Sequence, residues 1–131
     1  MTERATRRQF VQAALGAPVL LSLAHRAEAR SAESAPIKVG QIGTKHAHAN
    51  GHLRTLLKYP QHFEVVGVVE PDPEQREREG GEKPYSGQKW LTVEQLLATP
   101  GLQAVAVETQ VRDLLPTAQR CLDAGMHVHL D

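Results

Sequence analysis

Apolar and amphipathic segments alternate along the chain from residue 37 to residue 131. Four apolar runs are typical of strands buried in a parallel sheet, at 37–42, 63–69, 102–107 and 126–130. Residues 90–91 predict a fifth, shorter strand, and helices are expected between the strands, at 49–57, 74–79, 93–99 and 114–124. The alternation predicts an α/β fold, a doubly wound, Rossmann-like parallel sheet with helices on both faces. We expect the strand order 3-2-1-4-5, and the pattern leaves a flavodoxin-like order open.

Capping residues set the expected ends of two helices. Thr92 and Gln95 form a capping-box pattern, in which each side chain bonds the backbone amide of the other residue. Asp113 is a favourable N-cap for the last helix, and Pro116 would then lie in its first turn, where a missing N–H has little effect. Gly125 would end that helix.

The first 29 residues differ in character from the rest of the chain. A twin arginine, Arg7–Arg8, precedes an apolar run at 11–24, and a small-x-small pattern follows at 27–29. This order predicts a Tat-type export signal, and therefore a periplasmic or other extracytoplasmic location. The apolar run is short for a membrane span, and an uncleaved amphipathic or anchoring helix is the alternative. Residues 30–36 are small and polar and predict a linker.

Length and composition limit the classes of protein to consider. The chain has 131 residues, 40% of them hydrophobic, and a formal net charge of zero. These values fit one packed domain at residues 37–131 rather than a disordered chain. We expect no nucleic acid partner, because phosphate binding needs clustered Lys and Arg. Cys121 is the only cysteine, which excludes an intrachain disulfide and a cysteine-built zinc site.

The turn after the first predicted strand has the features of a dinucleotide-binding loop. Gly43, Thr44, Lys45 and His46 lie between a strand and a helix, where free amides and the helix dipole attract a pyrophosphate. Glu70 follows the second strand, where a carboxylate accepts hydrogen bonds from the hydroxyls of an adenosine ribose. An ordinary strand-to-helix turn and a solvated strand-end acid are the plainer interpretations. Because the Glu70 carboxylate would repel a 2′-phosphate, we expect NAD rather than NADP.

The histidines are concentrated at the first helix and the last strand. His48 and His52 are spaced i, i+4 on one helix face, which is a spacing that can bind zinc, but they do not form an HExxH motif. His127 and His129 alternate on one strand and would point the same way. We expect no metal site, with His46 lining the cofactor turn and the others serving as surface or supporting groups. A histidine-built metal protein is a further hypothesis.

Four segments carry a resemblance to a known family: IKVGQIGTKHAHA, FEVVGVVEPDPEQ, TVEQLLATPGLQAVAVET and AQRCLDAGMHVHLD. In this order and spacing they resemble the N-terminal nucleotide-binding domain of the Gfo/Idh/MocA oxidoreductases, over residues 37–131. The resemblance implies a dinucleotide cofactor and hydride transfer involving a sugar or polyol substrate. It also implies truncation before the family's catalytic lysine and second α/β domain, through which a homo-oligomer would form.

The chain departs from the family pattern at some positions and matches it at others. Lys45 and His48 replace two glycines of the fingerprint, and the Lys45 side chain would either crowd a pyrophosphate or pair with it. Thr109 matches the family's turn beneath the cofactor, whereas Glu108 does not. Asp131 matches the acidic position before the catalytic lysine. The resemblance therefore implies that Thr109 and Asp131 border the nicotinamide side.

Two functional hypotheses follow from these features. In the first, the chain is an exported NAD-binding domain of an oxidoreductase, with no catalytic residue of its own and no competence alone. In the second, it is an exported, non-catalytic module that binds a nucleotide or another ligand. Lys45 and the missing glycines favour the second hypothesis, and the order of the four segments favours the first.

Overall fold

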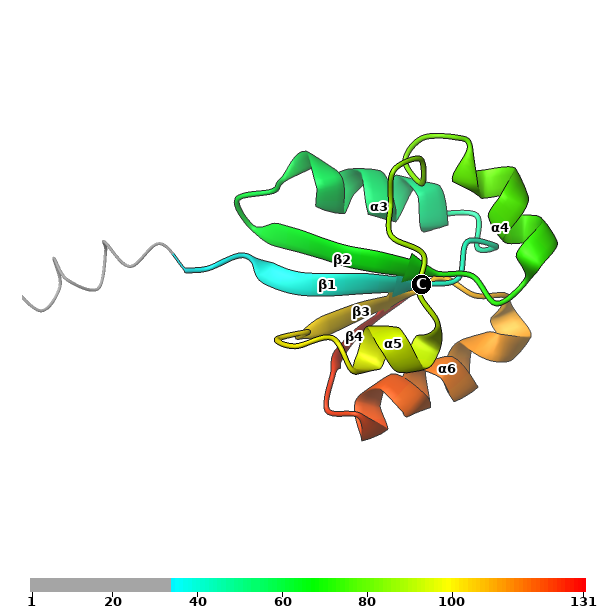
Figure 1. The fold of residues 1–131 in the computed structure, drawn as a ribbon. Coiled ribbons are helices and arrows are strands. Elements are labelled where there is room, and N and C mark those ends of the chain that lie inside the picture. The colour runs from blue at the N-terminus through cyan, green and yellow to red at the C-terminus, as the bar shows by residue number, and fades with distance from the viewer. Residues whose placement is uncertain (1–33) are drawn as a thin grey trace, which may run out of the picture. The chain divides into compact units, whose positions relative to one another are not determined.

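Four parallel strands form the centre of the structure (Figure 1). The computed structural model describes residues 34–131. The strands are β1 (Ile37–Ile42), β2 (Phe63–Val69), β3 (Ala104–Val107) and β4 (His127–Leu130). Their order across the sheet is β2-β1-β3-β4, and every pairing is parallel. The predicted export signal and most of the predicted linker lie outside the described residues.

The predicted third strand is reduced to a single parallel bridge, between Trp90 and Val68. The Val68 amide donates to the Lys89 carbonyl and the Leu91 amide donates to the Val68 carbonyl, both at 2.9 Å. This segment lies beside β2, in the place of the third strand in the predicted 3-2-1-4-5 order. The structure therefore confirms that order and excludes the flavodoxin-like one.

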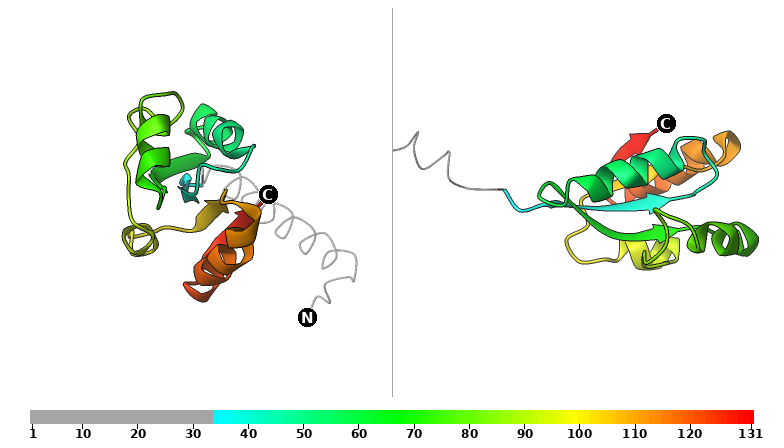
Figure 2. Two further views of the ribbon diagram at one scale, coloured as in Figure 1. Left: turned by 90° about the vertical axis from the view of Figure 1, so that its right-hand side faces the viewer. Right: turned by 90° about the horizontal axis from the view of Figure 1, so that it is seen from above.

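Helices cover both faces of the sheet. The described residues contain α3 (Ala49–Lys58), α4 (Pro73–Gly80), α5 (Val93–Leu97) and α6 (Val111–Asp123). α3 and α4 lie on one side of the sheet, and α5 and α6 lie on the other (Figures 1 and 2). Within residues 34–131, no helix combines the length and the apolar character that crossing a membrane requires.

The larger part of the hydrophobic core fills the space between the sheet and the helices α5 and α6. Its buried members are Ile42, Val69, Leu96, Leu102, Val105, Val107 and Cys121. Burial raises the pKa of the Cys121 thiol. On the α3 side a smaller cluster contains Leu53, Val68 and Tyr85. Burying an apolar side chain of this size contributes about 1.5–3 kcal/mol, so these contacts hold the strand ends in fixed positions.

Two predicted helix ends are confirmed. Thr92 caps α5, because its side chain accepts a hydrogen bond from the Gln95 amide and the Gln95 side chain accepts one from the Thr92 amide. Gly125 follows α6 with φ at 79°, the left-handed conformation that favours glycine after a helix.

The predicted start of α6 is wrong. Asp113 is not the N-cap, since the helix already begins at Val111 with Gln110 as its N-cap residue. Asp113 lies in the first turn, where its carboxylate also complements the positive end of the helix dipole. Pro116 consequently lies inside the helix, beyond the first turn.

Candidate functional site

A cavity lies at the edge where β1, β2 and β3 end. Its volume is about 460 Å³, within the size range of small-ligand sites, and we call it the crevice. Residues that follow the three strands line it, among them Gly43, Lys45, Glu70 and Thr109. β1 and β3 are the strands at which the chain changes from one sheet face to the other, and ligands of doubly wound sheets bind at such a switch point. The sheet thus brings four of the predicted site residues to one cavity.

Gly43 has the backbone conformation that the first turn requires. Its φ is 93°, a region that L side chains rarely adopt. A Cβ atom placed there would lie 2.6 Å from the Glu108 carbonyl oxygen and 2.8 Å from the Thr109 amide nitrogen. The turn therefore needs glycine both for its conformation and for its close approach to the end of β3.

The turn offers fewer free amides than the sequence suggests. The Gly43 amide donates to the Val69 carbonyl, and the His46 amide donates to the Glu108 carbonyl. The Thr44 amide donates to the Glu70 carboxylate at 2.9 Å. Among the described residues, only Lys45 of this turn has an amide without a hydrogen-bond partner. The expectation of a row of open amides is wrong, because strand-end groups on both sides of β1 already accept from the turn.

Glu70 is buried and anchors the turn. One oxygen of its carboxylate accepts from the Thr44 amide and from the Thr44 hydroxyl, at 2.9 and 2.8 Å. The other oxygen accepts from the Asp72 amide at 3.0 Å. An ionised carboxylate has about four acceptor positions, so these three bonds leave one position for a ligand. Glu70 also lines the crevice, with an exposed fraction of 7%.

The Lys45 side chain pairs with an acid of its own chain. Its Nζ lies 2.6 Å from Asp72 Oδ2. Asp72 is also the N-cap of α4 and accepts from the amides of Glu74 and Gln75. The Lys45 hydrogen bond, aided by the two amides, lowers the pKa of the Asp72 carboxyl. The lysine therefore links the turn to α4 along the wall of the crevice.

Thr109 presents an unsatisfied hydroxyl at the same place. Its Oγ1 is buried and has no hydrogen-bond partner within the part of the chain that the structure describes. α6 also lines the crevice, with Arg112, Pro116 and Arg120. Those three residues were not predicted from the sequence, because the face of α6 that lines the crevice depends on how the helix packs against the sheet.

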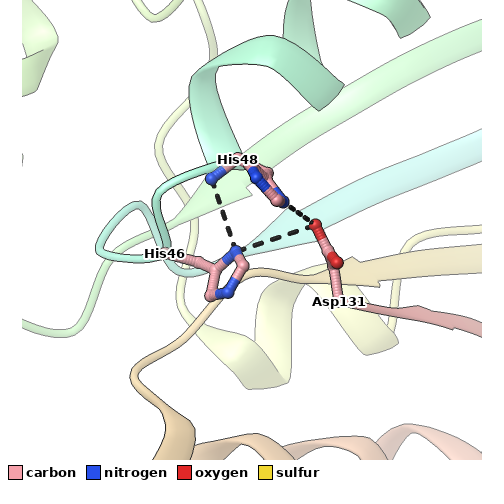
Figure 3. A group of neighbouring side chains, drawn as sticks. All are labelled: His46, His48 and Asp131. Carbon is pink, nitrogen blue, oxygen red and sulfur yellow. Dashed lines mark hydrogen bonds and ion pairs between the residues drawn. The ribbon is translucent and has the colours of Figure 1, made fainter.

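Two other predicted residues, His46 and Asp131, belong to a separate cluster, shown in part in Figure 3. Asp131 Oδ2 bonds to His48 Nδ1 and lies 3.8 Å from His46 Nδ1. The ring centroids of His46 and His48 are 5.2 Å apart. The hydrogen bond from His48, with the charges of the three nearby histidines, lowers the pKa of the Asp131 carboxyl. The turn, the start of α3 and the residue after β4 meet here.

Glu108, at the end of β3, completes this histidine–carboxylate cluster. It is fully buried, its Oε1 bonds to His52 Nδ1, and its Oε2 lies 3.5 Å from His46 Nδ1. The ring of His129 packs edge-on against His52 at 4.8 Å. Glu108 had no expected role, and the sequence signal that points to it is its position one residue before Thr109.

Comparison with known proteins finds similarity in structure. No family model and no curated protein matches the sequence. A putative oxidoreductase from Erwinia carotovora atroseptica SCRI1043 is 26% identical with a TM-score of 0.60, over 70% of this chain and 27% of that one. The WlbA dehydrogenase from Bordetella pertussis, solved with NADH and UDP-GlcNAcA, is 19% identical with a TM-score of 0.58, over 71% and 27%. GenD2 from gentamicin A biosynthesis, solved with NAD, is 21% identical with a TM-score of 0.61, over 75% and 27%.

The TM-scores, from 0.58 to 0.61, show that these neighbours share the fold of the domain. The domain has a Rossmann-like α/β fold. The chain spans about a quarter of the length of the proteins it matches, with 27% of each of these three covered. At this identity and coverage the likeness establishes the fold, and activity has to be argued from the site.

Proposed function

We propose that this chain is the NAD-binding N-terminal domain of a Gfo/Idh/MocA-type oxidoreductase. The complete protein would transfer a hydride between NAD and a hydroxyl-bearing carbon of a sugar or polyol. The observation that carries the proposal is the crevice, where a glycine turn, a buried carboxylate and an unpartnered hydroxyl meet at the switch point. Neighbours solved with NADH or NAD support the cofactor, and UDP-GlcNAcA in one of them supports a sugar-derived substrate.

In this proposal Glu70 binds the adenosine ribose. The acceptor position that its carboxylate retains would take a hydrogen bond from one ribose hydroxyl. The same charge would repel a 2′-phosphate, which favours NAD. Arg112 and Arg120 line the crevice, but each bonds to a neighbouring acid, Asp113 or Glu94, so neither supports a phosphate there.

The remaining contacts would hold the pyrophosphate and the nicotinamide half. Gly43, Thr44, Lys45 and His46 form the turn, and the free Lys45 amide would donate to a phosphate oxygen. Thr109 Oγ1 would gain a hydrogen-bond partner from the cofactor. Leaving a buried hydroxyl without a partner costs about 1–3 kcal/mol, so this bond would favour binding. Asp131 would border the nicotinamide side.

Calorimetric titration of the 131-residue chain with NADH and with NADPH tests this proposal. We expect NADH to bind more tightly than NADPH, and Glu70→Gln to reduce that preference. Glu77→Gln, on an exposed part of α4, is the matched control and should leave both affinities unchanged. Thr109→Val keeps the side-chain shape, removes the unpartnered hydroxyl and should weaken NADH binding about tenfold, or 1.4 kcal/mol.

A non-catalytic binding module is the alternative that one observation favours. Most amides of the turn are already bonded, and Lys45 is paired with Asp72, so the crevice has little to offer a pyrophosphate. A chain that stays folded but gives no heat and no thermal shift with millimolar NADH or NADPH would support this alternative and contradict NAD binding.

We also propose that the chain is exported through a Tat-type signal and is not competent for hydride transfer alone. The twin arginine supports the first part, and the coverage of only about a quarter of each solved neighbour supports the second. A reporter fused after residue 36 should reach the periplasm, and replacing Arg7 and Arg8 by lysine should retain it in the cytoplasm. Export that is unchanged by the double replacement would contradict a Tat route.

A further inference from the structure

We propose that the histidine–carboxylate cluster binds one divalent first-row transition-metal ion of the zinc class. The ligands would be His46, His48, Asp131 and Glu108. None of these four residues lines the crevice, although the proposed function also assigns His46 and Asp131 to the cofactor. It differs from the expectation of no metal site that the sequence alone supports.

Three of the ligand atoms lie close together, and Glu108 Oε2 approaches one of them. Zinc ligands at 2.0–2.1 Å in a tetrahedron lie about 3.4 Å from one another. His46 Nδ1 lies 3.5 Å from Glu108 Oε2 and 3.8 Å from Asp131 Oδ2. The ligand atoms of His46, His48 and Asp131 all lie within 4.8 Å of each other, and Figure 3 shows them converging. A small movement of these side chains would surround one ion.

A buried, unpartnered oxygen points to the same ion. Glu108 has an exposed fraction of 0%, and its Oε2 has no hydrogen-bond partner within residues 34–131. Removing a carboxylate from water is unfavourable unless a donor or a cation compensates it. No Lys or Arg pairs with Glu108 or Asp131 among the described residues, so only histidine side chains pair with these two carboxylates. A divalent cation would supply the missing positive charge.

The histidine nitrogens are oriented for coordination. His46 Nδ1 points into the cluster and makes only a long hydrogen bond of 3.4 Å with the His48 amide. A metal ion bound there would displace only this weak bond. Imidazole and carboxylate ligands without thiolate suit zinc and its neighbours, whereas calcium and magnesium prefer oxygen ligands alone.

The surroundings would hold the ligands in place. His52 Nδ1 bonds to Glu108 Oε1, the oxygen that does not face His46. His129 packs edge-on against His52 and limits the movement of that ring. Ligating carboxylates are usually hydrogen-bonded in this way, which fixes their orientation. His52 and His129 are therefore positioning residues in this proposal rather than ligands.

The test uses zinc alone as the probe. The purified chain is stripped with a chelator, loaded with Zn²⁺, freed of excess ion by gel filtration and assayed for bound metal. We expect one zinc ion per chain and a higher melting temperature in its presence. Cobalt loading should give the visible absorption of a tetrahedral site. No NAD is present, so failure here leaves the proposed cofactor site untouched.

Variants separate a built site from chance binding. His48→Ala and Asp131→Asn change exposed residues, should leave the fold intact and should each abolish retention of zinc. His62→Ala removes an exposed histidine outside the cluster and should retain one ion per chain. No retained zinc in the folded chain, or retention that His48→Ala leaves unchanged, would show that the cluster is only a hydrogen-bond network.

Discussion

Two carboxylates follow the strands on either side of β1, and their surroundings differ. Glu70, after β2, accepts two backbone amides and a hydroxyl, and both of its oxygens are satisfied. Glu108, after β3, bonds only to His52 through one oxygen, and its other oxygen has no partner. Both are buried, with exposed fractions of 7% and 0%.

The difference shows that burial alone does not define the role of an acid at a strand end. The donors around Glu70 are two backbone amides and the Thr44 hydroxyl, so this carboxylate stabilises the turn and keeps one acceptor position for a ligand. The groups around Glu108 are histidine side chains, which can bind a proton or a metal ion. The compensation of the Glu108 charge therefore depends on which of these the histidines bind. The predictions below test that contrast.

The largest effect is expected where the turn passes between the two carboxylates. Gly43→Ala should destabilise the chain by about 3 kcal/mol, because it combines an unfavourable positive φ with a contact against the β3 backbone. Gly87 also has a positive φ, 82°, but nothing lies within 4 Å of the Cβ position. Gly87→Ala should therefore destabilise by about 1 kcal/mol in urea unfolding. Equal losses for the two variants would contradict the close approach.

The next largest effect on stability is expected at Tyr85, a buried tyrosine near both carboxylates. Burial, with further contributions from Glu79, Glu108 and Glu70, raises the pKa of Tyr85 from 10.0 to about 12. The native state keeps this proton between pH 10 and 12 while the unfolded chain loses it, so stability should fall by roughly 3 kcal/mol as pH rises through that window. Tyr85→Phe should flatten this alkaline loss in thermal unfolding, and an unchanged slope would contradict the prediction.

Replacing each acid by glutamine compares the two carboxylates directly. Glu70→Gln should destabilise by about 2 kcal/mol, because an amide cannot accept all the hydrogen bonds of the carboxylate. Glu108→Gln should change the stability of the metal-free chain by less than about 1 kcal/mol, since it removes a buried charge that is only partly compensated. Chemical denaturation of both variants checks the order. A larger loss of stability for Glu108→Gln than for Glu70→Gln would contradict the different roles of the two acids.

The smallest effect is expected at an exposed ion pair on the crevice side. The Arg120 side chain bonds to Glu94 and, as the largest cause, lowers the pKa of that acid from 4.5 to about 2. The stabilisation is present above pH 4.5 and is lost as pH falls toward 2. Arg120→Ala should produce only a slight shift in melting temperature at pH 7, because exposed pairs are screened by solvent and salt. A shift comparable to that of Gly43→Ala would contradict this reasoning.

Features encoded by local pattern could be predicted from the sequence. The strands, their order, the capping box of α5 and the position of Glu70 follow from periodicity, turn residues and the general order of a doubly wound fold. The start of α6 could not be predicted with the same rules, because an acid is favourable both at the N-cap and in the first turn.

The histidine–carboxylate cluster depends on contacts that no local pattern records. Ala106 of β3 pairs with His129 of β4, and this register places the two strand ends beside the start of α3. Sequence alone gives the alternation of His127, His129 and Asp131, but not which helix covers that face. The pairing of Lys45 with Asp72 was missed for a similar reason, because it joins two loops across 27 positions.

The single cysteine has a consequence for the proposed export. Cys121 lies on the buried face of α6, and the raised pKa of its thiol keeps it in the unreactive, protonated form. It is therefore shielded from mixed disulfides and from dimerisation through sulfur. If the chain is exported as proposed, it would need neither a disulfide isomerase nor a reducing environment to stay in its native covalent state.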